Sequence, residues 1–317
     1  MNHISAPENL VTPHALQRLG SQTDILGECP LWDQAAQCLY WVDIRRPAIR
    51  RLTHATGEIQ TWAMPDLVGS IALVDDGRLL VAMPSQIALF DPVDGELSAW
   101  LPSLSLPEGH RFNDGRCDVQ GRFWVGSMHN TTRAPEGTLF CLEGSGPLKE
   151  VRHGICIPNS LAFSPNGDTL YFADSLHYRI YAHPYAPESG QMGEAQVFAQ
   201  STPPAFPDGS AVDADGFVWN AEFNGGRLLR YAPDGSLDRV INLPVARPTC
   251  CAFGGPNLDI LYITSTSQNM TELERQENPM AGALMAIVPG VHGLPEPRFS
   301  LSGPRIKTAP PTESNRS

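Results

Sequence analysis

The fold is decided at residues 207–221, which read PDGSAVDADGFVWNA. A short semi-apolar run is followed by an Asp-Ala-Asp-Gly turn and then by Phe, Val and Trp, residue types that favour β-strands. Two such runs joined by a turn that contains Gly predict a β-hairpin. Further along, RLLRY at 227–231 predicts a third strand between two more turns, and residues 237–243 predict a fourth. The unit is a four-stranded antiparallel meander.

The second strand of this meander recurs along the chain. Its six copies are LYWVD (39–43), LLVAM (79–83), FWVGS (123–127), LYFAD (170–174), FVWNA (217–221) and LYITS (261–265). Successive copies lie roughly 40–47 residues apart, which is the period of propeller blades. Six such sheets arranged radially predict an all-β fold, a six-bladed β-propeller of four-stranded antiparallel blades. A two-sheet sandwich is the alternative, but a sandwich does not need six equal units.

We expect a single propeller domain over residues 14–301 of the 317-residue chain. Residues 1–13 are polar and contain Pro, so we expect a flexible N-terminal leader. Residues 302–317 are rich in Pro and Ser without an apolar period, which predicts a disordered tail. Within the domain, residues 14–23 are expected to close the ring by pairing with the last blade.

Composition restricts the partners and the compartment. The net charge of −12 argues against nucleic acid and against an anionic membrane surface as partners, and it suits a site that holds a cation. The sequence shows neither a signal-peptide pattern nor an apolar stretch of transmembrane length. The seven cysteines are odd in number and form no Cys-x-x-Cys pair, so we expect reduced thiols and a cytoplasmic protein. The oligomeric state stays open.

One polar residue stands just before the expected first strand of each unit. The six are Glu28, Ser70, Asn113, Asn159, Asp208 and Thr249. Because the first strand of a propeller blade is the innermost, these side chains are expected to converge at one mouth of the central channel. The long connections at 129–137 and 266–282 are expected to leave from the same face. A polar cluster roofed by loops is the default hypothesis for a binding site.

The residue types in this ring indicate a metal. Taken singly, Asp208 and Asn113 are typical of plain turns, but Glu28 is not a turn residue. Buried carboxylates that are brought together repel unless a cation or a proton lies between them. Oxygen ligands from Glu, Asn and Asp indicate a hard divalent ion such as Ca²⁺, Mg²⁺ or Mn²⁺. Arg111 is the one cation that the sequence places within reach of this ring.

Several motifs around these residues resemble one family. They are GECPLW (27–32), RFNDG (111–115), PNSLA (158–162), PDG (207–209), FNGGR (223–227) and CAFGG (251–255). The chain resembles the family of senescence marker protein (regucalcin), gluconolactonase and luciferin-regenerating enzyme. The resemblance implies a six-bladed propeller that hydrolyses sugar lactones with one divalent metal. It places the metal ligands at Glu28, Asn159 and Asp208 and the substrate contacts at Arg111 and Asn113.

Two positions depart from the family pattern. Ser160 stands where the family usually has Gly, and residues 129–131 stand where some members carry an acidic pair near the substrate. The second departure leaves the sugar preference open.

The function that we predict is metal-dependent hydrolysis of an aldonolactone to the aldonic acid, in carbohydrate catabolism. Asp208 is expected to be both a metal ligand and the catalytic base, and the ion is Ca²⁺, Mg²⁺, Mn²⁺ or Zn²⁺. Two other functions stay open, because fold alone does not decide function. One is a calcium-binding regulatory propeller without turnover, and the other is hydrolysis of a phosphotriester or another ester on the same metal.

Overall fold

The computed structural model describes residues 16–101 and 104–305, which are almost entirely β-structure. The predicted leader lies outside the described residues, and so does the predicted tail except for residues 302–305. The described chain forms 25 strands, the short helix α1 (Glu272–Glu277) and one 3-10 turn (Ser175–His177). No described helix has the length and apolar character needed to cross a membrane.

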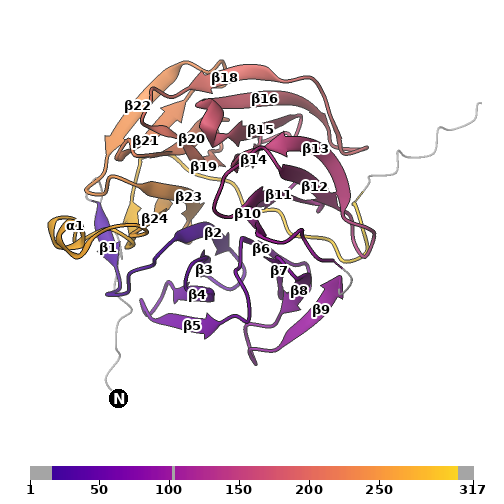
Figure 1. The fold of residues 1–317 in the computed structure, drawn as a ribbon, viewed down its shortest axis with the longest axis horizontal. Coiled ribbons are helices and arrows are strands. Elements are labelled where there is room, and N and C mark those ends of the chain that lie inside the picture. Colours follow the sequence, from indigo (N-terminus) through magenta and orange to yellow (C-terminus); the bar gives the residue numbers. More distant parts are fainter. Residues whose placement is uncertain (1–15, 102–103, 306–317) are drawn as a thin grey trace, which may run out of the picture.

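The strands form six antiparallel sheets around a central axis, so the predicted six-bladed propeller is confirmed (Figure 1). The first two blades are β2 (Gly27–Asp33), β3 (Cys38–Asp43), β4 (Ala48–Thr53), β5 (Ile59–Ala63), and β6 (Ser70–Leu73), β7 (Leu79–Met83), β8 (Gln86–Phe90), β9 (Leu97–Leu101). The third and fourth are β10 (His110–Cys117), β11 (Phe123–His129), β12 (Gly137–Leu142), β13 (Lys149–Ile155), and β14 (Pro158–Phe163), β15 (Thr169–Asp174), β16 (Arg179–Ala186), β17 (Gln191–Met192), β18 (Gln196–Gln200). The fifth and sixth are β19 (Phe206–Val212), β20 (Val218–Phe223), β21 (Arg227–Tyr231), β22 (Leu237–Asn242), and β23 (Pro248–Gly254), β24 (Ile260–Ser265), β25 (Leu284–Ile287), β1 (Gln17–Leu19).

All six copies of the marker sequence are the second strands of their blades, as predicted. The fourth blade differs from the expected four strands, because the short strand β17 also pairs with β16. The ring closes where β1 pairs with β25, with Gln17 opposite Ala286. This confirms the expected closing strand for residues 17–19.

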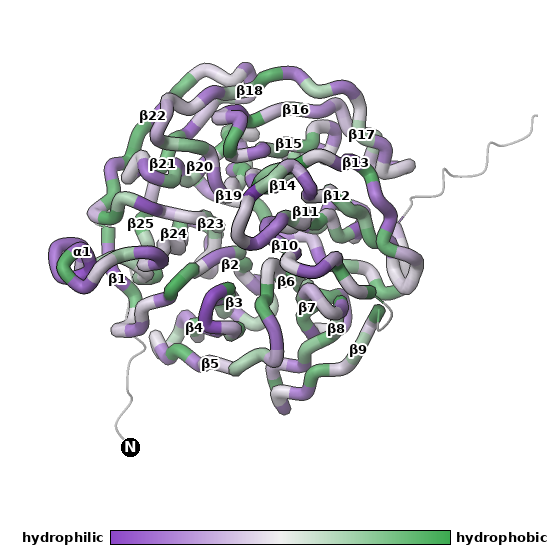
Figure 2. Tube along the Cα trace, viewed as in Figure 1, coloured by the Kyte–Doolittle hydropathy of each residue, from purple (hydrophilic) through white to green (hydrophobic). Residues whose placement is uncertain are grey.

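The blades pack face to face, so strands in the middle of a blade are buried on both sides. Every residue of β3 is buried, and four tryptophans are among the largest fully buried side chains: Trp32, Trp41, Trp124 and Trp219. Trp32 of blade one stacks on Tyr262 of blade six with 5.9 Å between ring centroids. Apolar residues recur in every blade, while α1 at the rim is largely hydrophilic (Figure 2). Aromatic packing between neighbouring blades therefore holds the ring together.

Two of the marker strands end in an Asp whose carboxylate binds the backbone just before the inner strand of the same blade. The Asp43 carboxylate accepts hydrogen bonds from the Ile25 and Leu26 amides at 2.9 and 3.1 Å. Asp174 does the same for the Cys156 and Ile157 amides at 2.8 and 3.1 Å. These carboxylates satisfy backbone donors just ahead of Glu28 and Asn159, and so they help to fix where the inner strands begin.

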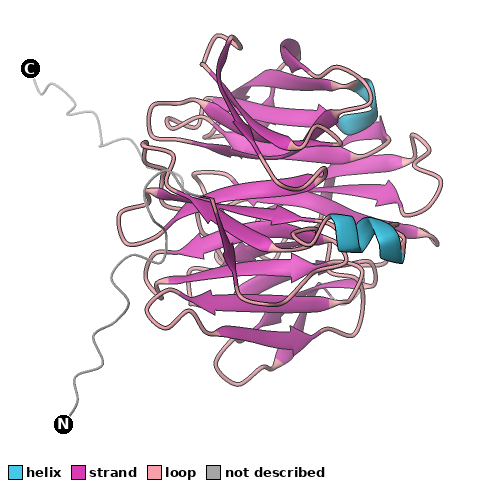
Figure 3. Cartoon of the chain, turned by 90° about the vertical axis from the view of Figure 1, so that its left-hand side faces the viewer, coloured by secondary structure: helices cyan, strands magenta, loops and turns pink. Residues whose placement is uncertain are grey.

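The C-terminal segment crosses the propeller on one face. It forms single bridges from Gly293 to Asp213 and from Phe299 to Val74, and it is the yellow trace that crosses the disc in Figure 1. The Arg305 amide donates to the Gln120 carbonyl at 2.9 Å, so the described part of the predicted tail contacts blade three. Figure 3 shows α1 and the 3-10 turn together on one side of the disc. The long β24–β25 connection, which contains α1, therefore leaves from the same face as the β15–β16 turn.

Candidate active site

Five predicted site residues line one small cavity of about 60 Å³ at the mouth of the channel where the inner strands begin. They are Glu28, Arg111, Asn113, Asn159 and Asp208. The other two members of the predicted ring are buried in interblade contacts and do not line this cavity. Ser70 Oγ lies 3.3 Å from Cys29 Sγ, and Thr249 Oγ1 donates to the Gly27 carbonyl at 2.5 Å.

The ring residues lie within or at the start of their strands and not before them, which corrects the sequence analysis. In five blades the register of the inner strand shifts at this point; in blade one Glu28 lies opposite Val42, and the next paired residue, Leu31, lies opposite Tyr40. Such β-bulges re-aim side chains while the pairing continues on both sides. Blade two has no shift between Ser70 and Leu73. The bulges explain why strand pairing and a polar cluster coexist.

Two carboxylates in the cavity have raised pKa values. Desolvation and the neighbouring Asp114 raise the pKa of Glu28 to about 8, and Arg111 acts against this rise. Burial raises the pKa of Asp208 well above its ordinary value, and Glu28 and Asp114 add to the shift. The protein therefore holds two carboxyl groups at a place where their negative charges are poorly compensated by its own residues.

A chain of hydrogen bonds orients the amides. Arg111 Nη1 donates to Asn113 Oδ1 at 2.5 Å, and Asn113 Nδ2 donates to Asn159 Oδ1 at 2.7 Å. On its other side, Asn159 Nδ2 donates to Ser175 Oγ at 2.8 Å, and Ser175 Oγ donates to the Pro207 carbonyl at 2.7 Å. The Asn159 oxygen is thus turned toward the cavity-lining Asn113, and Ser175 ties it to the residue before Asp208.

Ser160 supports the backbone of Asp208. Its φ of 57° lies in the left-handed region, which accounts for the Gly that the family usually has here. Its hydroxyl donates to the Asp208 carbonyl at 2.6 Å, and Asn220 Nδ2 donates to the same oxygen at 3.0 Å. In this chain the departure from Gly adds a buried hydrogen bond between blades four and five.

The residues present fit a divalent cation. No group of three or more His, Cys, Asp and Glu residues suited to a metal occurs in the described residues, so a site built on Glu28 and Asp208 would need an amide oxygen of the cavity, which Asn113 and Asn159 both offer. Two carboxylates and an amide oxygen are the ligands that hard divalent ions prefer. A cation between them would also relieve the repulsion that raises their pKa values.

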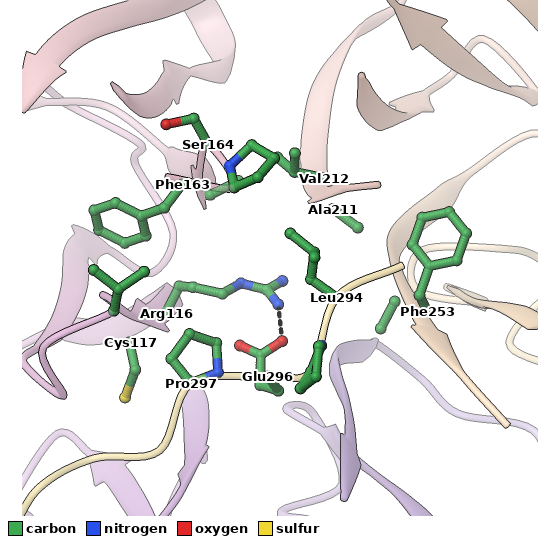
Figure 4. A pocket seen from close by; sticks show the side chains of 15 residues that line it. Arg116, Cys117, Phe163, Ser164, Ala211, Val212, Phe253, Leu294, Glu296 and Pro297 are labelled. Atoms are coloured by element: carbon green, nitrogen blue, oxygen red, sulfur yellow. Dashed lines mark hydrogen bonds and ion pairs between the residues drawn. The ribbon is translucent and has the colours of Figure 1, made fainter. Parts of the chain in front are cut away.

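A larger cavity of about 340 Å³ lies at the opposite ends of the inner strands, and Figure 4 shows its lining. Residues 294–297 of the C-terminal segment cover it. Its two charged residues neutralise each other, because Arg116 Nη1 lies 2.7 Å from Glu296 Oε2. The remaining lining is mostly apolar, so the smaller cavity is the candidate active site.

The small cavity has a further lining, made by residues that were not among the predicted site residues. This lining comprises Leu26, Arg45, Met128, Asn130, Arg133, Ile157, Phe206, Phe223 and Gln268. The two long connections were a sequence signal for three of these residues. Asn130 and Arg133 lie in the connection at 129–137, and Gln268 lies in the one at 266–282. Arg45 carried no such signal, since it lies in a short turn between β3 and β4.

Ser175→Ala is expected to lower the affinity for a divalent metal about 10–100-fold, the usual effect of losing a residue that orients a ligand. It should also cost about 1–3 kcal/mol of stability, because Asn159 Nδ2 and the Pro207 carbonyl lose a buried partner. Calorimetric metal titration and denaturant unfolding measure the two effects. The matched control is Ser265→Ala at the end of β24, whose hydroxyl donates to the Ala283 carbonyl at 2.9 Å. Equal metal affinities of the two variants would contradict the orienting role of Ser175.

The fold and the cavity define the class of protein. It is a six-bladed β-propeller with a cavity of carboxylates and amides at one mouth of its channel. The SMP-30/Gluconolactonase/LRE-like region family matches residues 26–267, and the chain belongs to this family. The resemblance inferred from the motifs is therefore confirmed.

Relatives cover nearly the whole chain. The 6-deoxy-6-sulfogluconolactonase of Pseudomonas putida is 37% identical over 88% of this chain and 96% of its own length. The L-arabinolactonase of Azospirillum brasilense is 33% identical over 89% of this chain and 94% of its own. Among solved structures, a calcium-binding protein, regucalcin, from Agrobacterium tumefaciens superimposes with a TM-score of 0.85 at 31% identity, covering 92% of this chain and 99% of its own.

Proposed function

We propose that the protein is a sugar lactonase, a carboxylic ester hydrolase that converts an aldonolactone to the aldonic acid with one divalent metal ion. The observation that carries the proposal is the meeting of Glu28, Asn159 and Asp208 with Arg111 and Asn113 in one cavity. The names of the Pseudomonas and Azospirillum relatives support the reaction class, and they point to different sugars.

Glu28, Asn159 and Asp208 would hold the ion. When bound, it would supply Lewis-acid polarisation of the lactone carbonyl and stabilisation of the negative charge that develops on the carbonyl oxygen. The Asp208 carboxylate accepts a proton from the attacking water and delivers it to the ring oxygen as the ester bond breaks.

Arg111 and Asn113 bind the ring hydroxyls and orient the lactone. Burial and the nearby Arg45 lower the pKa of Arg111 to about 10, so its guanidinium stays charged at neutral pH. Phe206 and Phe223 stack with 4.9 Å between their centroids and form an apolar side of the cavity. The substrate therefore meets hydrogen-bond donors on one side and a hydrophobic surface on the other.

Arg111→Ala is expected to raise the KM for polyhydroxylated lactones at least about 10-fold, because it removes charge-assisted hydrogen bonds to the substrate. Metal binding should be retained and should weaken less than in Ser175→Ala, since no ligand is removed and Arg111 reaches Asn159 only through Asn113. Steady-state kinetics and a metal titration of the same preparation measure both. An unchanged KM with a lower kcat would contradict a role in substrate binding.

The test of the proposed function is acid release from five- and six-membered aldonolactones. Metal-stripped protein is loaded with Ca²⁺, Mg²⁺, Mn²⁺ or Zn²⁺, and the rates are corrected for spontaneous hydrolysis. Turnover above this background supports the lactonase, and the rates identify the sugar and the metal.

A calcium-binding propeller without turnover is the second candidate function. It is favoured by the description of the Agrobacterium regucalcin as a calcium-binding protein. Calcium binding by a protein that releases no acid from any lactone would support this function over the lactonase.

A further inference from the structure

Two arginines stand at the outer part of the candidate active site and have no role in the proposed hydrolysis. Arg45 lies in the turn between β3 and β4 of blade one, and Arg133 lies in the β11–β12 connection of blade three. Arg111 is buried deeper in the same cavity, Arg45 is half-buried and Arg133 is exposed. The three guanidinium groups therefore run from the floor of the cavity toward solvent.

Neither outer guanidinium group is paired with a carboxylate among residues 16–101 and 104–305. Arg45 Nε donates to Gln268 Oε1 at 2.6 Å, and its Nη2 lies 3.5 Å from the Asn130 carbonyl, so both partners are neutral. Arg133 makes neither a hydrogen bond nor an ion pair with the described part of the chain. The arginines buried elsewhere do have acidic partners: Arg50 with Asp24, Arg116 with Glu296, Arg122 with Asp118 and Arg230 with Asp213.

The unpaired charges act on one another. Burial and Arg133 lower the pKa of Arg45, and both outer arginines contribute to the lowered pKa of Arg111. A divalent ion at the floor would offset the two charges of Glu28 and Asp208, so the cavity would keep the positive charge of its arginines. The opening of the cavity would thus carry a positive charge, although the net charge of the chain is −12. A local field of this kind attracts anions to the cavity.

The arginine-bearing loop is held in place, and the opposite side of the cavity is apolar. His129 Nδ1 accepts the amides of Thr131 and Thr132 at 3.3 and 3.2 Å, which fixes the backbone just before Arg133. Across the cavity, Phe206 and Phe223 offer no charge. A ligand with one charged end would therefore place that end between blades one and three.

We infer that Arg45 and Arg133 form a subsite for an anionic group at the end of the sugar lactone remote from the reacting carbonyl. The inference rests on the proposed lactonase function and narrows its substrate to acid-bearing aldonolactones. Phosphate, sulfonate and carboxylate share the required chemistry, because each offers several acceptor oxygens to the fork of a guanidinium group. The substrate bridges the subsite and the candidate metal ligands.

The test compares neutral gluconolactone with gluconolactones that carry phosphate, sulfonate or carboxylate on the terminal carbon. We expect at least one charged lactone to exceed the neutral one about 10-fold or more in kcat/KM, and the preferred group identifies the anion. Arg133→Gln should reduce this preference about 10-fold, since the variant removes a charge without breaking a bond within the described chain. The control is Arg46→Gln in the same turn as Arg45; Arg46 is exposed, lies outside the cavity and donates to the Thr23 carbonyl at 3.3 Å. It should keep the wild-type preference.

Salt provides a second measurement that needs no variant. Raising the ionic strength from about 0.05 to about 0.5 M should lower kcat/KM for the charged lactone more than for the neutral one. Equal turnover of neutral and charged lactones by the wild type, or equal losses on both in Arg133→Gln, would overturn the subsite and leave the lactonase intact. A wild type that hydrolyses none of these lactones with any of the four ions would overturn the proposed function, and the subsite with it.

Discussion

Asp208→Asn is expected to lower the kcat of lactone hydrolysis at least about 100-fold, because it removes the proposed proton acceptor. An amide keeps the shape of the side chain and one ligand oxygen, so metal binding should weaken without being lost. The backbone of residue 208 should stay in place, since Ser160 and Asn220 bind its carbonyl and not its side chain. Acid release at a saturating metal concentration measures the effect.

The matched control is Asp215→Asn, an exposed carboxylate of the same blade that lies outside the cavity. Its kcat should equal that of the wild type. If Asp208→Asn turns over lactones as fast as the control, Asp208 is a ligand only and another group accepts the proton.

Metal removal is expected to abolish hydrolysis and to destabilise the fold, with an effect that grows as the pH rises. Glu28 and Asp208 have raised pKa values in the folded chain, so the folded state without metal binds more protons than the unfolded state. Their contribution to stability is therefore present below pH 4.5, the ordinary pKa of Glu, and is lost as the pH rises through about 8. A bound cation replaces the protons, so its stabilising effect should increase over the same interval.

Paired thermal melts with metal and with chelator measure this at several pH values. A metal concentration 100 times the dissociation constant corresponds to about 2.7 kcal/mol, or a shift of several degrees. The difference between the two melts should be small near pH 5 and largest near pH 8. Asp24, whose pKa burial raises to about 6, titrates in both samples and cancels in the comparison, because it does not line the cavity. A difference that shrinks as the pH rises would contradict the proposed ligands.

The repeat of the blades and the floor of the candidate site could be predicted from the sequence. The marker strands are visible because burial on both faces demands continuous apolar runs such as those of β3 and β15. The position of Glu28, Asn159 and Asp208 at one mouth follows from the equivalent place of each residue in its repeat. Both features follow from the order and the period of residues along the chain, without any side-chain contact.

The other features of the fold and of the candidate site depend on contacts between distant residues, which a sequence pattern does not show. The β-bulges place Glu28 and Asn159 inside paired strands, and no characteristic residue pattern marks such a bulge in the sequence. Arg45 reaches the cavity from a short turn, and the neutral partners of its guanidinium group are set by residues that lie far away in the sequence. The C-terminal segment covers the far cavity through Glu296, which pairs with a residue 180 positions away.

The central claim is that Glu28, Asn159 and Asp208 hold one divalent ion at the mouth of the channel. Anomalous diffraction from crystals soaked in Mn²⁺ tests it most directly. The claim predicts one strong peak per chain in the small cavity, within about 2.0–2.6 Å of an oxygen from each of the three residues. A peak bound by other residues, or an empty cavity in crystals of a protein that hydrolyses lactones in the same Mn²⁺ solution, would contradict it.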